Sequence, residues 1–463
     1  METTVDVASP FASVVPPDAP ALIVPSFAPV PQAERISSVD VVRGLAVLGI
    51  LLMNIVGFAM HVAAYADPTV DGGATGINWW VYVINAVLVD GKMRGIFSLM
   101  FGAGVVILTS RAVERGAAAD AADIHYRRMI WLMLFGVAHA YLLWFGEILY
   151  PYAVLGLLLY PMRRLSARGL TIMATVFAVL MTLAMAGEAY HGQAMRDDAA
   201  AATAAVQRGE QLTDEQHDAQ DEWRDRIKGA KPDARELERV NTAFRGSFLS
   251  ALKERAGLVA MFHFTPVYFP VLWDMLAMML FGMAMVKTGV LSAERSFAFY
   301  AKMAAVGYGI GLPLSVWHVW RNVAVNFEHI AMGFNGIIYE PARILVCFGH
   351  VAVVMMIVKA GVLTAATSRL AAVGQMALSN YVLQSIVCST VFYGYGFGLF
   401  GTLQRYQVYY VVLACWIVHL AWSPWWLRHY RFGPLEWCWR SLTYWKRQPM
   451  RIARRPSVAA VNA

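Results

Sequence analysis

The chain has 463 residues, of which 58% are hydrophobic and only 15% are charged, and its formal net charge at pH 7 is +7. A soluble domain carries about 25% charged residues, so this composition excludes an ordinary soluble protein and predicts one that crosses a lipid bilayer several times. The positive charge does not indicate a nucleic-acid partner, because the basic residues gather between apolar segments and in the C-terminal tail, as the positive-inside bias expects.

The N-terminal residues 1–34 are rich in proline and alanine, and the first basic residue of the chain is Arg35. A secretory signal needs a basic start and a continuous apolar run, and this stretch has neither. We therefore expect residues 1–34 to form a disordered cytoplasmic tail.

The rest of the chain alternates between long apolar segments and polar connections, which predicts an all-α fold. We expect a polytopic membrane bundle of about ten transmembrane helices, with a first half (35–190), a charged helical extracytoplasmic hairpin (191–255), a second half (256–427) and a basic cytoplasmic tail (428–463). The expected spans are 39–60, 79–110, 129–145, 149–162, 169–189, 258–286, 300–320, 336–358, 370–392 and 406–426.

The basic residues predict the orientation of these spans. The connections 111–128, 163–168, 287–299 and 359–369 carry Lys and Arg, as does the C-terminal tail, so we expect all of them to face the cytoplasm. Both termini then lie inside the cell. The hairpin 191–255 lies outside, since long loops are translocated largely regardless of their charge.

The first span, 39–60, contains three polar side chains. Asp40 and Arg43 are three residues apart, so a helix places them on one face where they can pair, and Asn54 follows Arg43 by roughly 16 Å along the axis. They either line a functional cleft, or form an ordinary helix start with a snorkelling arginine and a structural network. Because polar groups within a span are costly and usually face a cavity or the bundle interior, we favour the cleft.

The second span, 79–110, is predicted to be one long or broken helix. Lys92 and Arg94 lie in its outer half, where two cations either hold an anionic group or snorkel to lipid phosphates. Further along, Gly102 and Gly104 are small enough to permit close contact with another helix.

A histidine and a carboxylate follow in the third span and the turn after it. If His139 and Glu147 lie close together, they form a general-base pair in which the carboxylate orients and stabilises the imidazole. The alternative is that His139 is simply a buried, hydrogen-bonded histidine.

The second half of the chain contains further intramembrane polar groups. Asp274 lies inside an apolar span, and Glu340 and Arg343 have the i,i+3 spacing of an ion pair. No arrangement of histidines or carboxylates has the spacing of a metal site. The four cysteines are scattered singly, so we interpret them as small core residues.

The segment 370–392 contains a third polar group. Ser379, Asn380 and Gln384 are close in sequence, with Asn380 and Gln384 on one helix face. These side chains either bind a substrate or bridge neighbouring helices.

Several of these segments together resemble the YeiB-like family of bacterial inner-membrane proteins, whose function is unassigned. The resemblance covers most of the membrane part and implies a multi-pass protein of the bacterial inner (plasma) membrane. The segments that carry it are 40–44, 49–54, 91–94, 97–104, 139–140, 146–149, 374–385, 426–428 and 433–437.

At greater distance the family is similar to the transmembrane acyltransferases, whose first span starts with an Arg-Gly pair, here Arg43 and Gly44. The bacterial O-acetyltransferases of that superfamily have a histidine eleven residues after the arginine, whereas this chain has Asn54. The lysosomal-type enzymes use a histidine beyond the first span. His61 is the positional candidate for that histidine here, and His139 is a candidate on its chemistry alone.

The resemblance implies an acyltransferase fold and the transfer of an acyl group from cytoplasmic acyl-CoA to an extracytoplasmic or lipid-linked acceptor, with no bound cofactor. The rival hypothesis is a transporter or export component for a small polar solute. The acceptor and the oligomeric state stay open, and the lipid bilayer is the one partner expected. In the acyltransferase hypothesis His139 and Glu147 are catalytic, and the substrate-binding residues are Asp40, Arg43, Asn54, Lys92, Arg94, Ser379, Asn380 and Gln384.

Overall fold

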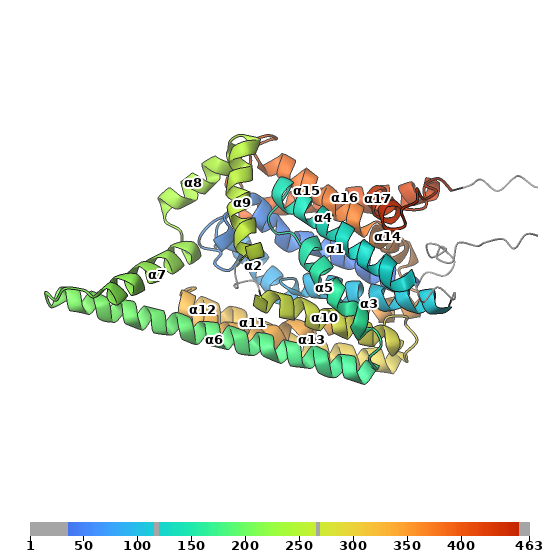
Figure 1. Cartoon of the computed structure of the whole chain (residues 1–463), viewed down its shortest axis with the longest axis horizontal. Coiled ribbons are helices and arrows are strands. Elements are labelled where there is room, and N and C mark those ends of the chain that lie inside the picture. Colours follow the sequence, from blue (N-terminus) through green and yellow to red (C-terminus); the bar gives the residue numbers. More distant parts are fainter. Residues whose placement is uncertain (1–35, 115–119, 265–268, 453–463) are drawn as a thin grey trace, which may run out of the picture.

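The computed structural model describes residues 36–114, 120–264 and 269–452, and in these ranges the regular structure is entirely helical (Figure 1). The predicted tail 1–34 lies outside the described residues. The helices are α1 (Ser37–Ala59), α2 (Ile77–Leu88), α3 (Lys92–Glu114), α4 (Asp120–Leu142), α5 (Leu149–Met162), α6 (Ala167–Gln207), α7 (Asp214–Ala230), α8 (Ala234–Arg245), α9 (Phe248–Phe264), α10 (Phe269–Lys287), α11 (Phe297–Ala324), α12 (His329–Asn335), α13 (Tyr339–Ala360), α14 (Thr364–Gln375), α15 (Ala377–Phe392), α16 (Arg405–His429) and α17 (Pro434–Thr443), with short 3-10 turns at Val62–Tyr65 and Gly336–Ile338.

Six stretches in the described part of the chain are long and apolar enough to cross a membrane, or seven if one bent pair is a single span. This multi-pass character agrees with the sequence, but the expected number of about ten spans is not reproduced. The expected span 370–392 is one reason, because α14 and α15 meet there at a bend of 83°. The expected span 149–162 coincides with α5, whose 14 residues reach only about 21 Å, and the expected span 258–286 falls on two helices, α9 and α10.

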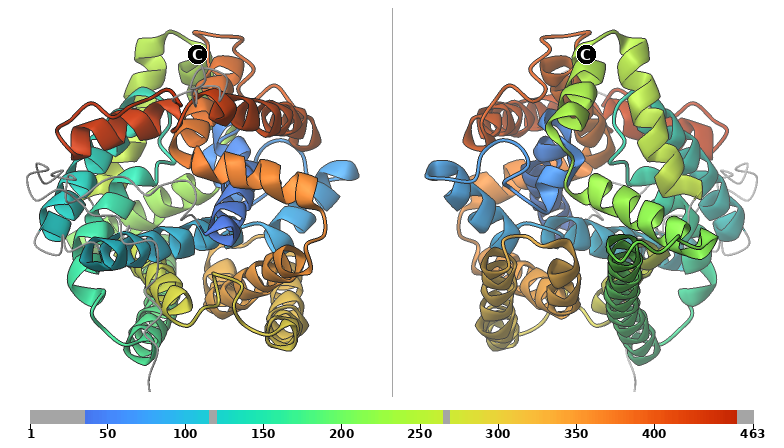
Figure 2. Two further views of the ribbon diagram at one scale, coloured as in Figure 1. Left: turned by 90° about the vertical axis from the view of Figure 1, so that its right-hand side faces the viewer. Right: turned by 90° about the vertical axis from the view of Figure 1, so that its left-hand side faces the viewer.

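Helix α1 lies at the centre of the bundle. In its apolar window 72% of the residues are buried inside the protein, against 11% for α6 and 22% for α11, and Figure 2 shows α1 in blue with other helices around it. It packs mainly against α3, α14, α15 and α16. The first span therefore forms the core of the protein, whereas α6 and α11 offer most of their apolar surface to the membrane.

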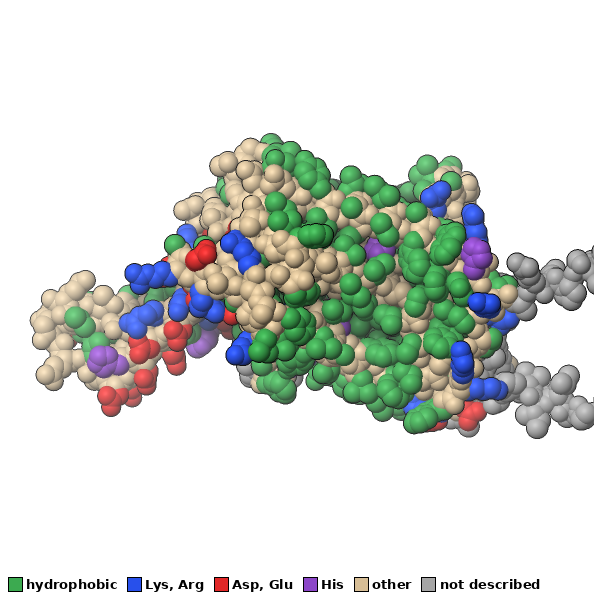
Figure 3. All heavy atoms as spheres, turned by 90° about the horizontal axis from the view of Figure 1, so that it is seen from above, with side chains coloured by type: hydrophobic (Ala, Val, Ile, Leu, Met, Phe, Trp, Pro, Cys, Tyr) green, Lys and Arg blue, Asp and Glu red, His purple; other side chains and the backbone are tan. Residues whose placement is uncertain are grey.

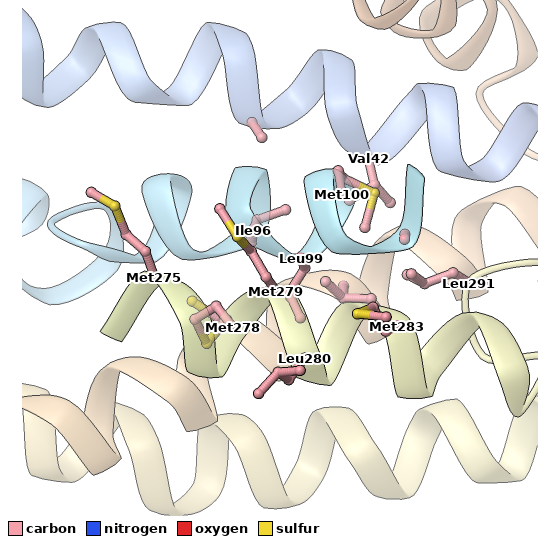
Figure 4. Close-up of a cluster of buried hydrophobic side chains, with 14 of the residues drawn as sticks. Val42, Ile96, Leu99, Met100, Met275, Met278, Met279, Leu280, Met283 and Leu291 are labelled. Atoms are coloured by element: carbon pink, nitrogen blue, oxygen red, sulfur yellow. The ribbon is translucent and has the colours of Figure 1, made fainter. Parts of the chain in front are cut away.

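The crossing of α3 and α10 depends on two glycines. At Gly102 a Cβ atom would lie 1.9 Å from the Met279 carbonyl oxygen, and at Gly282 it would lie 1.9 Å from the Leu99 carbonyl oxygen, so α3 and α10 touch backbone to backbone. Figure 4 shows Met279 beside Leu99 in this contact, among other buried side chains of both helices. The predicted close contact at Gly102 is confirmed. A Cβ atom added at Gly104 would have no atom of another helix within 4 Å, so that part of the prediction is wrong.

Helix α6 is 41 residues long, or roughly 60 Å, about twice the thickness of the hydrocarbon core. Figure 1 shows its far end and α7 projecting beyond the other helices. The boundary expected at residue 190 thus falls inside one continuous helix. In the charged region 191–255, α7 is tied back to α6 by an ion pair in which Arg226 Nη2 lies 2.8 Å from Glu188 Oε1.

The two ends of the bundle differ in charge. We call the end where α1 begins, and where α3, α5, α10, α13 and α16 finish, the basic end. It is the right-hand end in Figure 3, where Lys and Arg side chains gather next to a broad band of hydrophobic side chains, while mixed charges lie at the opposite end. At this end the Lys287 ammonium donates hydrogen bonds to the Arg163 and Leu165 carbonyl oxygens.

Candidate functional site

The helix predicted over 79–110 is broken inside the bundle, between α2 and α3. Gly91 lies in the break with φ of +66°, and a Cβ atom there would lie 2.1 Å from the Tyr339 hydroxyl oxygen. Glycine is the residue that adopts this backbone conformation at no steric cost. Inside a membrane protein such a break must either be buried in protein or line a cavity, because it frees backbone carbonyl groups that need hydrogen-bond donors.

Side chains on α3 and α13 satisfy the freed carbonyl groups. The Lys92 ammonium donates to the Ala86 carbonyl oxygen at 2.7 Å, and His350 Nε2 lies 2.9 Å from the Leu88 carbonyl oxygen. Arg343 Nη1 donates at 3.2 Å to the Gly91 carbonyl oxygen, which also accepts a hydrogen bond from the Gly95 backbone N–H. Lys92 is only 1% exposed. It therefore stabilises the helix break in this structure, which corrects the expectation that it faces an anionic group or the lipid surface.

Beside the break lies a buried ion cluster. Arg94 Nη1 is 2.5 Å from one carboxylate oxygen of Asp274, whose other oxygen accepts a hydrogen bond from Arg343. Arg343 also pairs with Glu340 at 2.7 Å, as their spacing predicted. Two arginines and two carboxylates balance in charge, so Arg94 is already neutralised by the protein and does not supply a free cation for an anionic ligand.

Two cavities meet at the break. The larger, about 680 Å3, extends among α1, α2, α6, α11 and α12, and we call it the outer cavity; the smaller, about 320 Å3, is the middle cavity. Asn54, Arg94 and Glu147 line the middle cavity. Both cavities are lined by Met53, Tyr65, Asp90 and Tyr339.

Asp90 is the functional candidate that our sequence interpretation missed. It belongs to the break itself, lines both cavities, and its carboxylate has no hydrogen-bond partner within the described ranges. The signal was present in the sequence as an acid next to a glycine within an apolar stretch. Only the tertiary structure places this residue between two cavities.

A third cavity, about 260 Å3, lies at the basic end, and we call it the arginine cavity. The Asp40–Arg43 pair predicted from spacing is present, with the Arg43 Nη1 nitrogen 2.9 Å from Asp40 Oδ1, and both residues line this cavity. Arg43 thus faces a cleft, as we favoured, and its side chain is 26% exposed. The charged residues of the wall are Arg43, Arg111, Arg128, Arg440, Asp40 and Glu436, and the remainder is mostly apolar, with Phe97, Phe101, Tyr152, Tyr381 and Trp439 among its rings.

The first turn of α5 separates the arginine cavity from the middle cavity. Leu149 and Tyr152 line the former, whereas Ile148 and Pro151 line the latter. The Tyr152 hydroxyl lies 2.6 Å from the Ser98 hydroxyl, which locks this partition to α3. The two cavities therefore lie on either side of this turn.

The predicted pairing of His139 with Glu147 is wrong. Glu147 caps the start of α5, where its carboxylate accepts hydrogen bonds from the Leu149 and Tyr150 backbone N–H groups. His139 Nε2 lies 2.8 Å from the Ser385 hydroxyl, and its ring packs on that of Tyr381 with centroids 5.0 Å apart. His139 is thus the buried, hydrogen-bonded histidine of the alternative interpretation.

The other histidine candidate, His61, also makes a local contact. Its Nδ1 accepts a hydrogen bond from the Ala63 backbone N–H at 3.2 Å and caps the 3-10 turn after α1. The His61 backbone N–H in turn donates to the Asp71 carboxylate. This histidine shapes the loop after the first span.

The polar group on α15 bridges helices. Ser379 bonds the Glu436 carboxylate of α17, and Gln384 Nε2 donates to the Val47 carbonyl oxygen of α1 at 3.2 Å. Asn380 donates to the Val373 carbonyl oxygen and the Ser423 hydroxyl at 3.1 and 3.0 Å. The structure thus gives these side chains the bridging role that we had left open.

The proteins whose sequences resemble this chain are themselves uncharacterised. Residues 285–446 match a family described as a protein of unknown function, DUF418. The chain is 28% identical to the uncharacterized protein YeiB of Escherichia coli, over 89% of this chain and 96% of that protein, and 28% identical to the uncharacterized protein YxaH of Bacillus subtilis, over 94% and 100%. No solved structure matches the chain. The chain is therefore similar, over most of its length, to uncharacterised proteins of the YeiB kind, and its residues 285–446 match a family of unknown function.

Proposed function

We propose that this protein transfers an acyl group from acyl-CoA, bound from the basic end, to an extracytoplasmic or lipid-linked acceptor that approaches from the opposite end. The arginine cavity carries the proposal, because four arginines face two carboxylates there, in walls that are otherwise mostly apolar. Guanidinium groups bind phosphate in a planar, bidentate manner. Apolar walls suit the rest of an amphiphilic donor.

The partition formed by the first turn of α5 supports the direction of transfer. A donor in the arginine cavity and an acceptor in the middle cavity would be separated only by the Tyr152–Ser98 contact and its neighbours. An acyl group would then need to pass this turn rather than a whole membrane. In this proposal His139 is a positioning residue, because it packs on Tyr381, which lines the arginine cavity.

Replacing Arg43 with lysine tests donor binding. Lysine keeps the charge but loses the planar fork, so we expect the affinity for acyl-CoA to fall by the equivalent of roughly 1–3 kcal/mol. A ligand that binds the folded state raises its stability, so thermal unfolding in detergent, with increasing acyl-CoA, measures the affinity of both proteins.

Arg295→Lys is the matched control, because Arg295 lies near the basic end but outside the arginine cavity and donates to the Thr288 carbonyl oxygen. We expect this control to respond to acyl-CoA as the unchanged protein does. Equal responses of Arg43→Lys and the unchanged protein would exclude Arg43 from the donor site. If acyl-CoA stabilised neither the unchanged protein nor the two variants, acyl-CoA would not be the donor.

Two features favour the second candidate, a transporter or export component for a small polar solute. Broken helices at the α2–α3 and α14–α15 junctions, and cavities on both sides of a partition, are also typical of secondary transporters. Incubation with isotope-labelled acyl-CoA followed by mass spectrometry of lipids and glycans separates the two. A transferase yields a labelled product, whereas a transporter yields none.

We further propose that the basic end faces the cytoplasm of a bacterial inner membrane, with both termini inside. Reporter fusions at Asp120 and at the C-terminus are expected to give cytoplasmic signals, because the connections near them are basic. A fusion at Gln207, where α6 ends at the opposite end of the bundle, is expected to give an extracytoplasmic signal. A cytoplasmic signal at Gln207 would overturn this orientation.

A further inference from the structure

We propose that the outer and middle cavities form one binding site for an uncharged ligand with several hydroxyl groups, anchored by Asp90. Asp90 lies where the two cavities meet, in the only non-helical break between α2 and α3 within the described range 77–114. Discontinuous helices mark binding sites in membrane proteins because their termini and exposed groups face the cavity. This site is separate from the arginine cavity.

The polar atoms of the site require both donors and acceptors from a ligand. Among the described residues, the Asp90 carboxylate and the Tyr339 hydroxyl have no hydrogen-bond partner, and both residues line the outer cavity. A hydroxyl group both donates and accepts, so a polyhydroxy compound complements this mixed set better than a ligand that only donates.

The charges around Asp90 favour an uncharged ligand. The Lys92 ammonium lies 5.5 Å from the centre of the Tyr339 ring, and the Arg405 guanidinium lies 5.8 Å from that of Tyr82. The protein's own cations therefore already occupy these tyrosine rings. The Lys92 charge also interacts with the Asp90 carboxylate, which weakens the attraction of that carboxylate for a cationic ligand. An anionic ligand would in turn be repelled by Asp90.

The charged region 191–255 lies at the rim of this site. Arg226 of α7 donates to Glu188 of α6 at 2.8 Å and to His329 Nε2 of α12 at 3.2 Å, and all three residues line the outer cavity. A ligand from the end opposite the basic end would therefore reach Asp90 past this contact. If the acyl acceptor binds in this site, that role rests on the proposed function. Binding of a ligand at Asp90 does not depend on the proposed function.

Thermal unfolding of the full chain in detergent, without acyl-CoA, tests the site with three probes of similar size: glucose (uncharged), glucosamine (cationic) and gluconate (anionic). We expect glucose to stabilise the protein most. Asp90→Asn keeps the side-chain volume and one acceptor oxygen but loses the charge, so the affinity for glucose should fall about fivefold to tenfold. Tyr339→Phe, which removes a single hydroxyl group, should also weaken glucose binding and serves if Asp90→Asn does not fold.

Asp123→Asn is the matched control, because Asp123 is exposed on α4 and pairs with Arg127 near the basic end. It should respond to glucose as the unchanged protein does, which cancels any general effect of sugar on folding. Three results would overturn the proposal. Glucose could fail to stabilise the protein, it could stabilise both site variants as much as the unchanged protein, or glucosamine or gluconate could stabilise the protein more than glucose does. Since acyl-CoA is absent, the result stands whether or not the arginine cavity binds a donor.

Discussion

The Asp274→Ala variant is expected to be less stable than the unchanged protein by about 3–5 kcal/mol of unfolding free energy. Asp274 is 1% exposed and contacts both Arg94 and Arg343. Its removal leaves two arginines with Glu340 as the single remaining carboxylate of the cluster. An uncompensated charge buried in the bundle is costly, and Arg343 also holds the carbonyl group of Gly91.

Unfolding in detergent by heat or by increasing sodium dodecyl sulfate measures this loss. Asp123→Ala is the matched control, since it breaks an exposed pair with Arg127 and should cost about 0–1 kcal/mol. If Asp274→Ala were no less stable than Asp123→Ala, the buried ion cluster would not support the helix break.

A methyl group at Gly102 is expected to cost about 3 kcal/mol, the upper part of the range for overpacked cores. The new Cβ atom would lie 1.9 Å from the Met279 carbonyl oxygen. Relief requires α3 and α10 to move apart, because the clash is with backbone rather than with a flexible side chain. The reciprocal contact of Gly282 with Leu99 would be opened by the same movement.

Gly104→Ala provides the internal control, two residues away on the same helix. Its Cβ atom meets no other atom within 4 Å, and alanine is the better helix former, so this variant should be more stable by about 0.5–1 kcal/mol. The same unfolding measurements compare the two variants. Equal stability of Gly102→Ala and Gly104→Ala would contradict the close crossing of α3 and α10.

Contacts within a single helix were predictable from spacing alone. Asp40 pairs with Arg43, and Glu340 pairs with Arg343, as the i,i+3 spacing indicated. Apolar composition likewise predicted the helical class and the multi-pass character. Helical geometry is repeated along the chain, so neighbours on one helix follow from residue numbers.

Contacts between distant segments were not predictable in this way. Glu147 caps α5 instead of orienting His139, whose partner Ser385 is 246 positions away. Whether a carboxylate meets an imidazole or a free backbone N–H group depends on where the turn after α4 places it. A single sequence does not encode that placement in any local pattern.

The sequence by itself determined the lipid environment of the protein and its secondary structure. A low fraction of charged residues and long apolar runs require helices in a bilayer, because each backbone group then finds its hydrogen-bond partner within the helix. What only the tertiary structure decided is the use of the polar residues. Lys92 holds a broken helix and Arg94 is neutralised by Asp274, whereas Asp90 faces two cavities and finds no hydrogen-bond partner in the described part of the chain. The physical reason is that an intramembrane polar group must be satisfied by whichever group packing brings to it, and packing joins segments that the sequence keeps far apart.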